Sequence, residues 1–376
     1  MNGIFLKSTR RGYAFSRCLA VVVAAGILCT AAGGATLTGT VLGPDEAPVS
    51  GVVVETGSIQ AVTDETGAFR LTGLDAGETI VRIRGEAGEG RAAVAVGEDD
   101  TAVVLSYPVI TKVVLLHDND THFNFNQRET FEAEVNAIRE RYANVYLLSA
   151  GDIFVRHADR WAEPGDIAYY AEMCAYMIDI MNDIGYDVCT LGNHELFYLG
   201  NYTREALERA QFPLLAANIG IETDKLPPVQ PYVVFETQNE LSIAVLGVTR
   251  SNERPGVETL DFIETARSYE HLADEHDLFV ALTHIGLGRD RALAEAMPEL
   301  DVIVGGHTNH LLEQGERVNG VLVTMAGGPP PGHRHQVNPE WPKYLGKIKI
   351  IFENERIIEK TARVMTFEAE VAQAAP

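Results

Sequence analysis

The chain has 376 residues, of which 46% are hydrophobic and 22% are charged, a composition typical of a globular protein with two or three domains. Its formal net charge of -23 argues against a nucleic-acid polymer as a partner, because phosphate backbones select basic surfaces. The negative charge does not argue against a small phosphorylated substrate, since bound divalent cations would reverse the local charge.

The first 35 residues are predicted to be an export signal. Lys7, Arg10, Arg11 and Arg17 form a basic region before a short apolar core at residues 18–28, and small residues follow the core. This core is shorter than the about 20 residues of a membrane-spanning helix, so we expect no membrane span in the mature chain. The arginine pair fits twin-arginine export as well as the general secretory route, and both stay open. We therefore expect a periplasmic or secreted protein.

Cys174 and Cys189 are the two cysteines that remain after the signal. Two cysteines are too few for a disulfide framework in an exported chain. Because Cys174 lies on the apolar face of a predicted helix and Cys189 in a predicted strand, we expect two buried thiols.

Residues 36–108 are predicted to form an all-β sandwich domain. Strand-like runs at 38–42, 48–55, 61–63, 68–71, 79–84 and 101–105 are separated by turn residues, without helical periodicity of useful length. The series G-x-V, P-V-x-G-V-x-V, T-D-x-x-G-x-F and L-x-A-G resembles the carboxypeptidase regulatory-like, transthyretin-like modules of bacterial exported proteins. The resemblance implies an accessory role, such as spacing, stabilising, or binding a surface or protein partner.

Residues 109–376 are predicted to form an α/β domain. Strands are expected at 112–116 and 144–149, and further strands are expected to end near 191, 217, 247, 283, 304 and 325. Helices are expected at 129–141, 167–184, 205–210, 265–273 and 289–296, and a closing hairpin at 345–352 and 356–365. Such alternation places loops with functional residues at strand ends.

Residues that can bind metal follow the predicted strands of this second domain. The clusters are Asp120-Thr121-His122, Gly151-Asp152, Gly192-Asn193-His194-Glu195, Thr283-His284 and Gly305-Gly306-His307. One such cluster alone is equally typical of a polar turn or a core histidine. Five in one domain, each after an apolar strand, favour a site with two metal ions.

The motifs D-x-H, G-D, G-N-H-E, T-H and G-G-H, in this order, resemble those of the calcineurin-like metallophosphoesterases, and within them the 5'-nucleotidase family. The segments LHDNDTH at 116–122, MNDIGYD at 181–187 and LLAANI at 214–219 add family character. The resemblance covers about residues 112–366, the catalytic domain only. It implies a four-layer α/β/β/α sandwich that holds two divalent ions.

The resemblance also implies which residues hold the ions. One ion would be bound by Asp120, His122 and Asp152, and the other by Asp152, Asn193, His284 and His307, so that Asp152 bridges them. Asn309 stands where the family has Gln or His, and we expect it rather than His310 to complete the first ion's ligands. His194 would be the catalytic residue that faces the leaving group or the phosphoryl oxygens. Manganese, zinc, iron, magnesium and calcium all suit these ligands.

The implied activity is hydrolysis of nucleotides or related small phosphate esters by a water that bridges the metals. Two alternatives stay open: hydrolysis of a sulfur ester or thiosulfonate on the same scaffold, and a non-enzymatic binding protein with a structural metal site. Phe123 replaces the family's Gly after His122, and Phe197 replaces the Asp that orients the catalytic His. We expect no nucleoside-binding C-terminal domain in this chain. The loop at 327–335 either contacts phosphate through Arg334 or is a solvated loop.

Overall fold

The computed structural model describes residues 24–25, 34–43, 46–85, 88–98, 100–107, 109–125, 127–154, 164–196, 201–221, 226–250, 257–328 and 343–367. They belong to two compact units, Met1–Thr111 with Ile351–Ile358, and Lys112–Ile350 with Glu359–Pro376. The predicted export signal lies outside the described residues, except for Gly34, Ala35 and a two-residue strand, β1 (Ala24–Ala25). Among the helices that the structure describes, none is long and apolar enough to cross a membrane.

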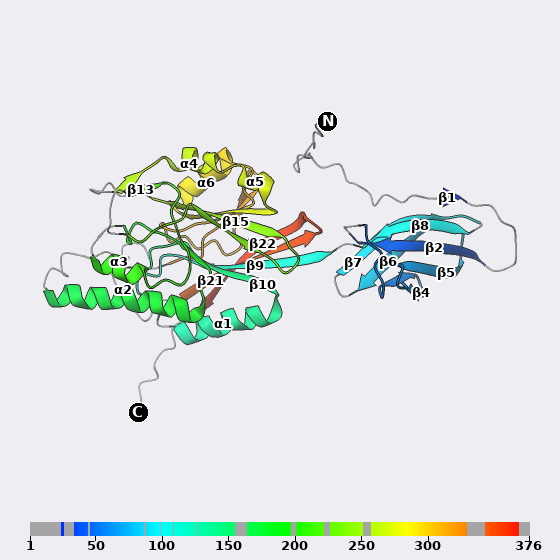
Figure 1. Ribbon diagram of the computed structural model, residues 1–376, viewed down its shortest axis with the longest axis horizontal. Helices are drawn as coiled ribbons and strands as arrows, with labels where there is room; N and C mark the ends of the chain where they lie inside the picture. The colour runs from blue at the N-terminus through cyan, green and yellow to red at the C-terminus, as the bar shows by residue number, and fades with distance from the viewer. Residues whose placement is uncertain are drawn as a thin grey trace, which may run out of the picture. The chain divides into compact units, whose positions relative to one another are not determined.

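The N-terminal unit contains two four-stranded sheets, ordered β1-β8-β2-β5 and β4-β3-β6-β7 (Figure 1). The strands are β2 (Ala35–Leu42), β3 (Val53–Thr56), β4 (Ile59–Val62), β5 (Ala68–Leu74), β6 (Gly77–Gly85), β7 (Gly88–Val96) and β8 (Thr101–Ser106). Buried and exposed residues alternate along β8, as expected for a strand with one face on a core. Leu37 and Leu105 from the first sheet share that core with Val54 and Ile83 from the second. The N-terminal unit is therefore β-rich, in agreement with the predicted fold class.

One strand of this unit was not predicted, and one sequence motif has a clear structural role. Strand β7 was not predicted, because its sequence GEGRAAVAV is rich in Gly and Ala, which have low strand propensity; pairing with β6 along its whole length supports it. In the T-D-x-x-G-x-F motif, the Asp64 carboxylate accepts hydrogen bonds from the backbone N–H groups of Thr66 and Ala68, both at 2.9 Å. The motif therefore closes a turn.

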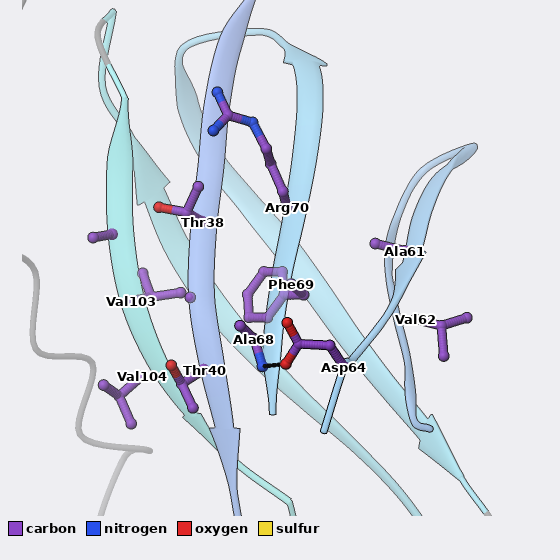
Figure 2. Close-up of a pocket in the computed structure, with 12 residues that line it drawn as sticks. Thr38, Thr40, Ala61, Val62, Asp64, Ala68, Phe69, Arg70, Val103 and Val104 are labelled. Atoms are coloured by element: carbon purple, nitrogen blue, oxygen red, sulfur yellow. Dashed lines mark hydrogen bonds between the residues drawn. The ribbon is translucent and has the colours of Figure 1, made fainter. Parts of the chain in front are cut away.

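The outer face of the β1-β8-β2-β5 sheet is hollowed beside β4 (Figure 2). Thr38, Thr40, Arg70 and Val104 line this concavity, which has a volume of about 840 Å³. Most of its lining side chains are short, and this leaves the sheet surface open.

The second unit is built on two six-stranded sheets, ordered β12-β11-β10-β9-β21-β22 and β14-β15-β17-β18-β20-β19. The first contains β9 (Ile110–Asp118), β10 (Asn144–Ser149), β11 (Val188–Thr190), β12 (Leu214–Leu215), β21 (Lys343–Glu353) and β22 (Arg356–Phe367). The second contains β14 (Tyr232–Glu236), β15 (Ser242–Thr249), β17 (Leu278–His284), β18 (Val302–Val304), β19 (Glu316–Val318) and β20 (Val321–Thr324). A small additional sheet pairs β13 (Ile219–Ile221) with β16 (Val257–Thr259).

Helices cover the outer faces of both sheets (Figure 1). On the first sheet lie α1 (Arg128–Arg141), α2 (Pro164–Ile184) and α3 (Asn201–Leu207), and on the second α4 (Phe262–Ser268), α5 (Leu272–Glu275) and α6 (Leu287–Ala296). The inner faces meet directly, as shown by the rings of Tyr146 on β10 and Phe235 on β14, which stack with centroids 4.8 Å apart. The unit is thus the predicted four-layer α/β/β/α sandwich.

Most predicted elements of this unit are present, with two corrections. The helix expected at 205–210 begins and ends earlier, as α3. The single helix expected at 265–273 is two helices, α4 and α5, separated at Tyr269. The Asp261 side chain caps α4 by accepting from the N–H groups of Ile263 and Glu264, so the helix starts earlier than its apolar spacing indicates. Cys174 and Cys189 are buried free thiols, as predicted.

Parallel pairing determines where the site lies. Strands β9, β10, β11 and β12 pair in parallel, and so do β15, β17, β18 and β20. The carboxyl ends of all strands in such a set meet at one edge. Every cluster singled out in the sequence follows one of these strands, except Thr283-His284, which ends β17.

Candidate metal centre

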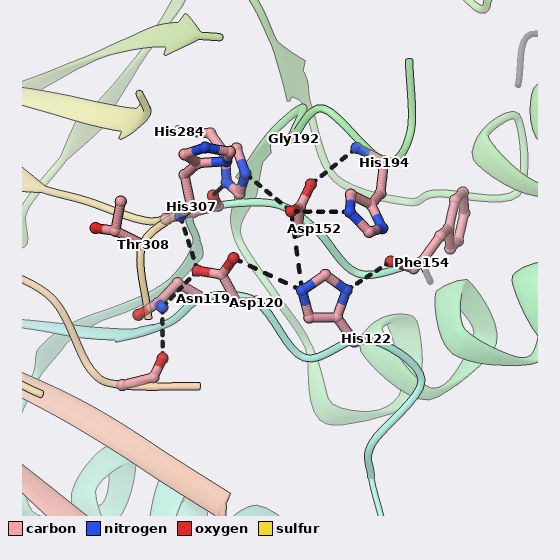
Figure 3. Close-up of polar contacts among 12 residues, drawn as sticks. Asn119, Asp120, His122, Asp152, Phe154, Gly192, His194, His284, His307 and Thr308 are labelled. Atoms are coloured by element: carbon pink, nitrogen blue, oxygen red, sulfur yellow. Dashed lines mark hydrogen bonds and ion pairs between the residues drawn. The ribbon is translucent and has the colours of Figure 1, made fainter. Parts of the chain in front are cut away.

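The carboxyl ends of five parallel strands bring the predicted ligands together, and Figure 3 shows Asp120, His122, Asp152, His194, His284 and His307. Asp120 and His122 follow β9, and Asp152 follows β10. Asn193 and His194 follow β11, His284 ends β17, and His307 and Asn309 follow β18. Residues from both sheets therefore converge on one centre.

Five of these residues have a backbone conformation that side chains rarely adopt. The φ angles are 52° at Asp120, 45° at His122, 55° at Asp152, 80° at His307 and 56° at Asn309. Each such conformation costs about 1–3 kcal/mol outside glycine, and it persists only where the surroundings enforce it. Strain concentrated on predicted ligands is typical of a functional site.

Asp152 lies at the middle of the centre. Its Oδ2 atom is 3.1 Å from Nε2 of His284, 3.8 Å from Nε2 of His194 and 3.9 Å from Nε2 of His122. Its Oδ1 atom accepts a hydrogen bond of 2.9 Å from the backbone N–H of His194. One carboxylate oxygen therefore faces three imidazoles while the other fixes the side chain.

Two histidines are held in the tautomer that metal binding needs. Nδ1 of His122 is 3.0 Å from the carbonyl oxygen of Phe154, and Nδ1 of His284 is 2.6 Å from that of Ala150. Carbonyl oxygens only accept, so each Nδ1 carries the proton and each Nε2 has a free lone pair in the neutral ring. A backbone partner of this kind orients ligating histidines in many metal sites.

Asp120 is oriented in a similar way. Its Oδ2 accepts from Nδ2 of Asn119 and from the backbone N–H of His307, both at 2.8 Å, while Oδ1 is 3.7 Å from Nε2 of His122. Asn119 also donates to the carbonyl of Gly327 and accepts from the N–H of Ala326, which joins β9 to the end of β20. Sequence reasoning assigned no role to Asn119.

Asn309 is placed beside Asp120, whereas His310 is not. A Cβ atom at Gly328 would lie 3.0 Å from Cγ of Asn309 and 3.1 Å from Cβ of Asp120, so these two side chains flank the glycine closely. His310 is exposed, and its Nδ1 is 2.9 Å from Oγ1 of Thr308. Asn309 as a ligand of the first ion stays a prediction, and of the two side chains it is the one that lies beside Asp120.

Glu195 holds two of the ligand loops together. Its carboxylate is fully buried and accepts from the backbone N–H groups of Gly192 at 2.8 Å, Phe154 at 2.9 Å and Asp152 at 3.0 Å. Glu195 is the last residue of the G-N-H-E motif, and no function was predicted for it. Three donors converging on one glutamate leave no signal in the sequence, because the loops that they join are about 40 residues apart in it.

Two glycines allow these loops to touch. Gly151 has φ +81°, and a Cβ atom there would lie 2.5 Å from the backbone nitrogen of Gly192. A Cβ atom at Gly192 would collide with the backbone nitrogen and carboxylate of Asp152. Gly192 is therefore needed for the close approach of two backbones.

The charges of the centre shift the pKa values of its members. Burial alone would lower the pKa of His284, but the carboxylates of Asp152 and Asp120 outweigh it and raise the pKa to about 9. Burial would raise the pKa of Asp152, but His194, His284 and His122 hold it well below its usual range. The pKa of His307 is lowered to about 4, mainly by burial and by the nearby His284.

The residues present fit divalent metal ions. Within the described part of the chain, Asp120 Oδ1, His122 Nε2, His284 Nε2 and His307 Nδ1 are buried atoms that make no hydrogen bond. Two groups, His122 with Asp152 and His194, and Asp152 with His284 and His307, each have ligand atoms within 4.8 Å of one another. Buried polar atoms are rarely left without partners, and mixed carboxylate and imidazole donors suit divalent cations.

His194, predicted to be catalytic, thus also lies within reach of the first group. Its ring meets that of His122 edge-on, with centroids 4.6 Å apart. Phe123, at the family's glycine position, has φ +61°, and its ring packs 5.6 Å from Tyr170 and 5.9 Å from Phe154. Aromatic packing therefore accompanies the strain. Phe197 and Arg334 lie outside the described residues.

The comparison with protein families agrees with this geometry. The profile of the calcineurin-like phosphoesterases matches residues 113–311. The chain belongs to this family. Its members are divalent-metal-dependent phosphoesterases, and the match includes every predicted metal ligand.

Individual relatives share the catalytic unit. The chain is 26% identical over 289 residues to the trifunctional nucleotide phosphoesterase protein YfkN of Bacillus subtilis, covering 66% of this chain and 18% of that protein. It is 30% identical over 226 residues to the uncharacterized metallophosphoesterase YunD of the same species, covering 57% of this chain and 47% of that protein. A 5'-nucleotidase precursor from Thermus thermophilus has the same fold, with a TM-score of 0.54, 24% identity, and coverage of 68% of this chain and 55% of that chain. The chain spans less than two thirds of the length of these relatives.

Proposed function

We propose that the chain hydrolyses phosphate esters of small compounds, with nucleotides as the first candidates, at a centre of two divalent ions. One ion would be held by Asp120, His122, Asp152 and Asn309. The other would be held by Asp152, Asn193, His284 and His307. Nucleotides come first because curated relatives are named as nucleotide phosphoesterases and 5'-nucleotidases.

The observation that carries this proposal is the position of Asp152 Oδ2. It lies within 3.9 Å of imidazoles from both ligand groups, as a bridging carboxylate must. A single-metal site would not need one carboxylate shared between two sets of histidines. The Nε2 atoms of His122 and His284 both face this oxygen.

When bound, the two ions would supply an activated water and neutralise charge on the phosphoryl group. The chain's own residues would do the rest. Asp120 and Asp152 balance the cationic charge, and the carbonyls that bond His122 and His284 keep both rings aligned. His194, 6% exposed, lies at the edge of the centre, where its Nε2 would donate a proton or hydrogen bond to the leaving-group oxygen.

A substrate panel tests the proposal. Purified protein reconstituted with manganese is assayed on nucleotides, other phosphomonoesters, phosphodiesters, and sulfur esters including thiosulfonates. We expect turnover of phosphate esters and about two bound metal ions per chain by elemental analysis. No bound metal after reconstitution would refute the proposal, and turnover of sulfur esters alone would favour the alternative substrate class.

The bridging role has its own test, Asp152→Asn. We expect activity to fall by at least about 10³-fold, because the substitution removes charge from both ions at once. Asp179→Asn, at an exposed helical aspartate 42% accessible and paired with Arg209, is the matched control and should keep wild-type turnover. Near-normal turnover of Asp152→Asn would refute the bridge.

We also propose that the chain is exported and that its N-terminal sandwich is an accessory domain of the carboxypeptidase regulatory-like type. The basic and apolar pattern of residues 1–35 supports export. N-terminal sequencing of protein recovered from the periplasm or medium would show cleavage before about residue 36. An intact N-terminus on cytoplasmic protein would contradict export.

A further inference from the structure

Arg250 is a cation at the edge of the centre that neither the sequence motifs nor the ligand assignment uses. It directly follows β15, whose last residue, Thr249, is in register with His284 on the neighbouring parallel strand β17. The end of β15 therefore lies at the same sheet edge as the ligands. Arg250 is half-buried there.

Its guanidinium contacts a predicted ligand directly. Nη1 of Arg250 is 2.6 Å from Nε2 of His307. The backbone N–H of the same histidine donates to Asp120 at 2.8 Å. A positive charge is thus held next to His307, whose backbone is in turn bonded to a residue assigned to the other ion.

The proton count at His307 gives this contact a consequence. A guanidinium has only N–H donors, so Nε2 must accept and the proton of the neutral ring must be on Nδ1. Coordination of a metal through Nε2 would need the lone pair that Arg250 uses. Coordination through Nδ1 would move the proton to Nε2, where it would face another donor. The Arg250 bond and metal coordination by His307 therefore exclude each other.

A displaced guanidinium would be well placed to bind substrate. It carries five N–H donors in a planar fork that matches two oxygens of a phosphoryl group. The site's predicted ligands are otherwise carboxylates, amides and imidazoles, so Arg250 would add a donor that can bind two phosphoryl oxygens together.

We propose that Arg250 competes with a divalent ion for His307 and, once displaced, binds the phosphoryl group of the substrate. This inference rests on the proposed phosphoesterase function. Arg250, a residue of the unit that holds the metal centre, would thus bind the phosphoryl group.

Two binding measurements test the inference without relying on turnover. Metal-stripped protein is titrated with Mn²⁺ by calorimetry, and manganese-loaded protein is then titrated with inorganic phosphate. In Arg250→Ala we expect Mn²⁺ to bind about 2- to 10-fold more tightly, because one competing hydrogen bond is gone. We expect phosphate to bind about 10- to 100-fold more weakly, the effect of losing charge-assisted hydrogen bonds.

Two further variants sharpen the result. Arg250→Lys keeps the charge but loses the fork, so its phosphate affinity should fall between those of wild type and Arg250→Ala. Arg291→Ala removes an exposed arginine paired with Glu316 and should match wild type in both titrations. If esters are hydrolysed, Arg250→Ala should raise KM more than it lowers kcat.

The opposite results would overturn the inference. Weaker Mn²⁺ binding in Arg250→Ala would mean that Arg250 supports His307 as a ligand instead of competing for it. Unchanged phosphate affinity would remove the substrate role. If wild-type protein hydrolyses no ester but both titrations behave as expected, the proposed function fails while the role of Arg250 stands.

Discussion

Replacing Glu195 should uncouple two ligand loops and destabilise the catalytic unit. In Glu195→Gln, one oxygen can still accept from the N–H groups of Gly192 and Asp152, but the amide nitrogen would face the N–H of Phe154. One unpaired buried donor costs about 1–3 kcal/mol. Glu195→Ala leaves all three donors unpaired, which adds up to about 3–9 kcal/mol if the contributions sum. Since net stability is about 5–15 kcal/mol, the alanine variant should be close to unfolding.

Denaturant unfolding followed by circular dichroism measures these losses, with manganese and with a chelator. We expect the order wild type, Glu195→Gln, Glu195→Ala in decreasing stability. Metal affinity should be about 10- to 100-fold weaker in the glutamine variant, because the lost bond to the Phe154 N–H loosens the loop that carries Asp152. Glu208→Gln is the matched control, since Glu208 is 43% accessible and pairs with Arg204 on the helix surface. A loss below about 0.5 kcal/mol in Glu195→Ala would refute the reasoning, because surface substitutions reach that size.

Two further predictions concern the metal ligands. Asn309→Ala should weaken manganese binding by about 10-fold or more. His310→Ala should change manganese binding little, because that ring is exposed. Equal effects of the two substitutions in calorimetry would count against Asn309 as a ligand. Asp152 and Asp120 raise the pKa of His284 to about 9, so below that pH a proton occupies the ring and must leave before a cation binds. Metal affinity should therefore rise by up to about tenfold per pH unit between about pH 6.5 and 8.5, and a flat profile in that range would contradict the proton count.

Much of the fold could be predicted from periodicity. The Met- and Tyr-rich face of residues 167–184 forms α2, and the apolar run at 144–149 is strand β10 without a change of boundary. The failures have local causes. Strand β7 has little intrinsic strand propensity and depends on its partner β6. The early start of α4 depends on a side-chain cap at Asp261, which apolar spacing does not reveal.

The residues expected to be metal ligands lie together at one centre, but the residues that hold their loops in place were not predicted. Asp120, Asp152 and His284 each belong to short motifs at strand ends, which sequence order alone can reveal. Asn119 and Glu195 bind backbone groups of loops distant in sequence, and a backbone N–H is the same for every residue except proline. No residue pattern can therefore reveal such contacts.

The predicted ligands with positive φ angles lie in loops that are hydrogen-bonded to each other. The loop after β9 continues to pair with the loop after β10: Asp120 N–H bonds to Gly151, His122 N–H to Asp152 and Phe123 N–H to Ile153, at 2.9, 3.1 and 2.9 Å. In a regular strand, successive side chains point to opposite faces. Left-handed residues interrupt that alternation, and this lets carboxylates and imidazoles from adjacent loops face one centre, while the hydrogen bonds between the loops offset part of the strain. Because the loops are fixed by the chain's own hydrogen bonds, a metal ion would meet ligands that are already ordered, and little of its binding energy would be spent on arranging them.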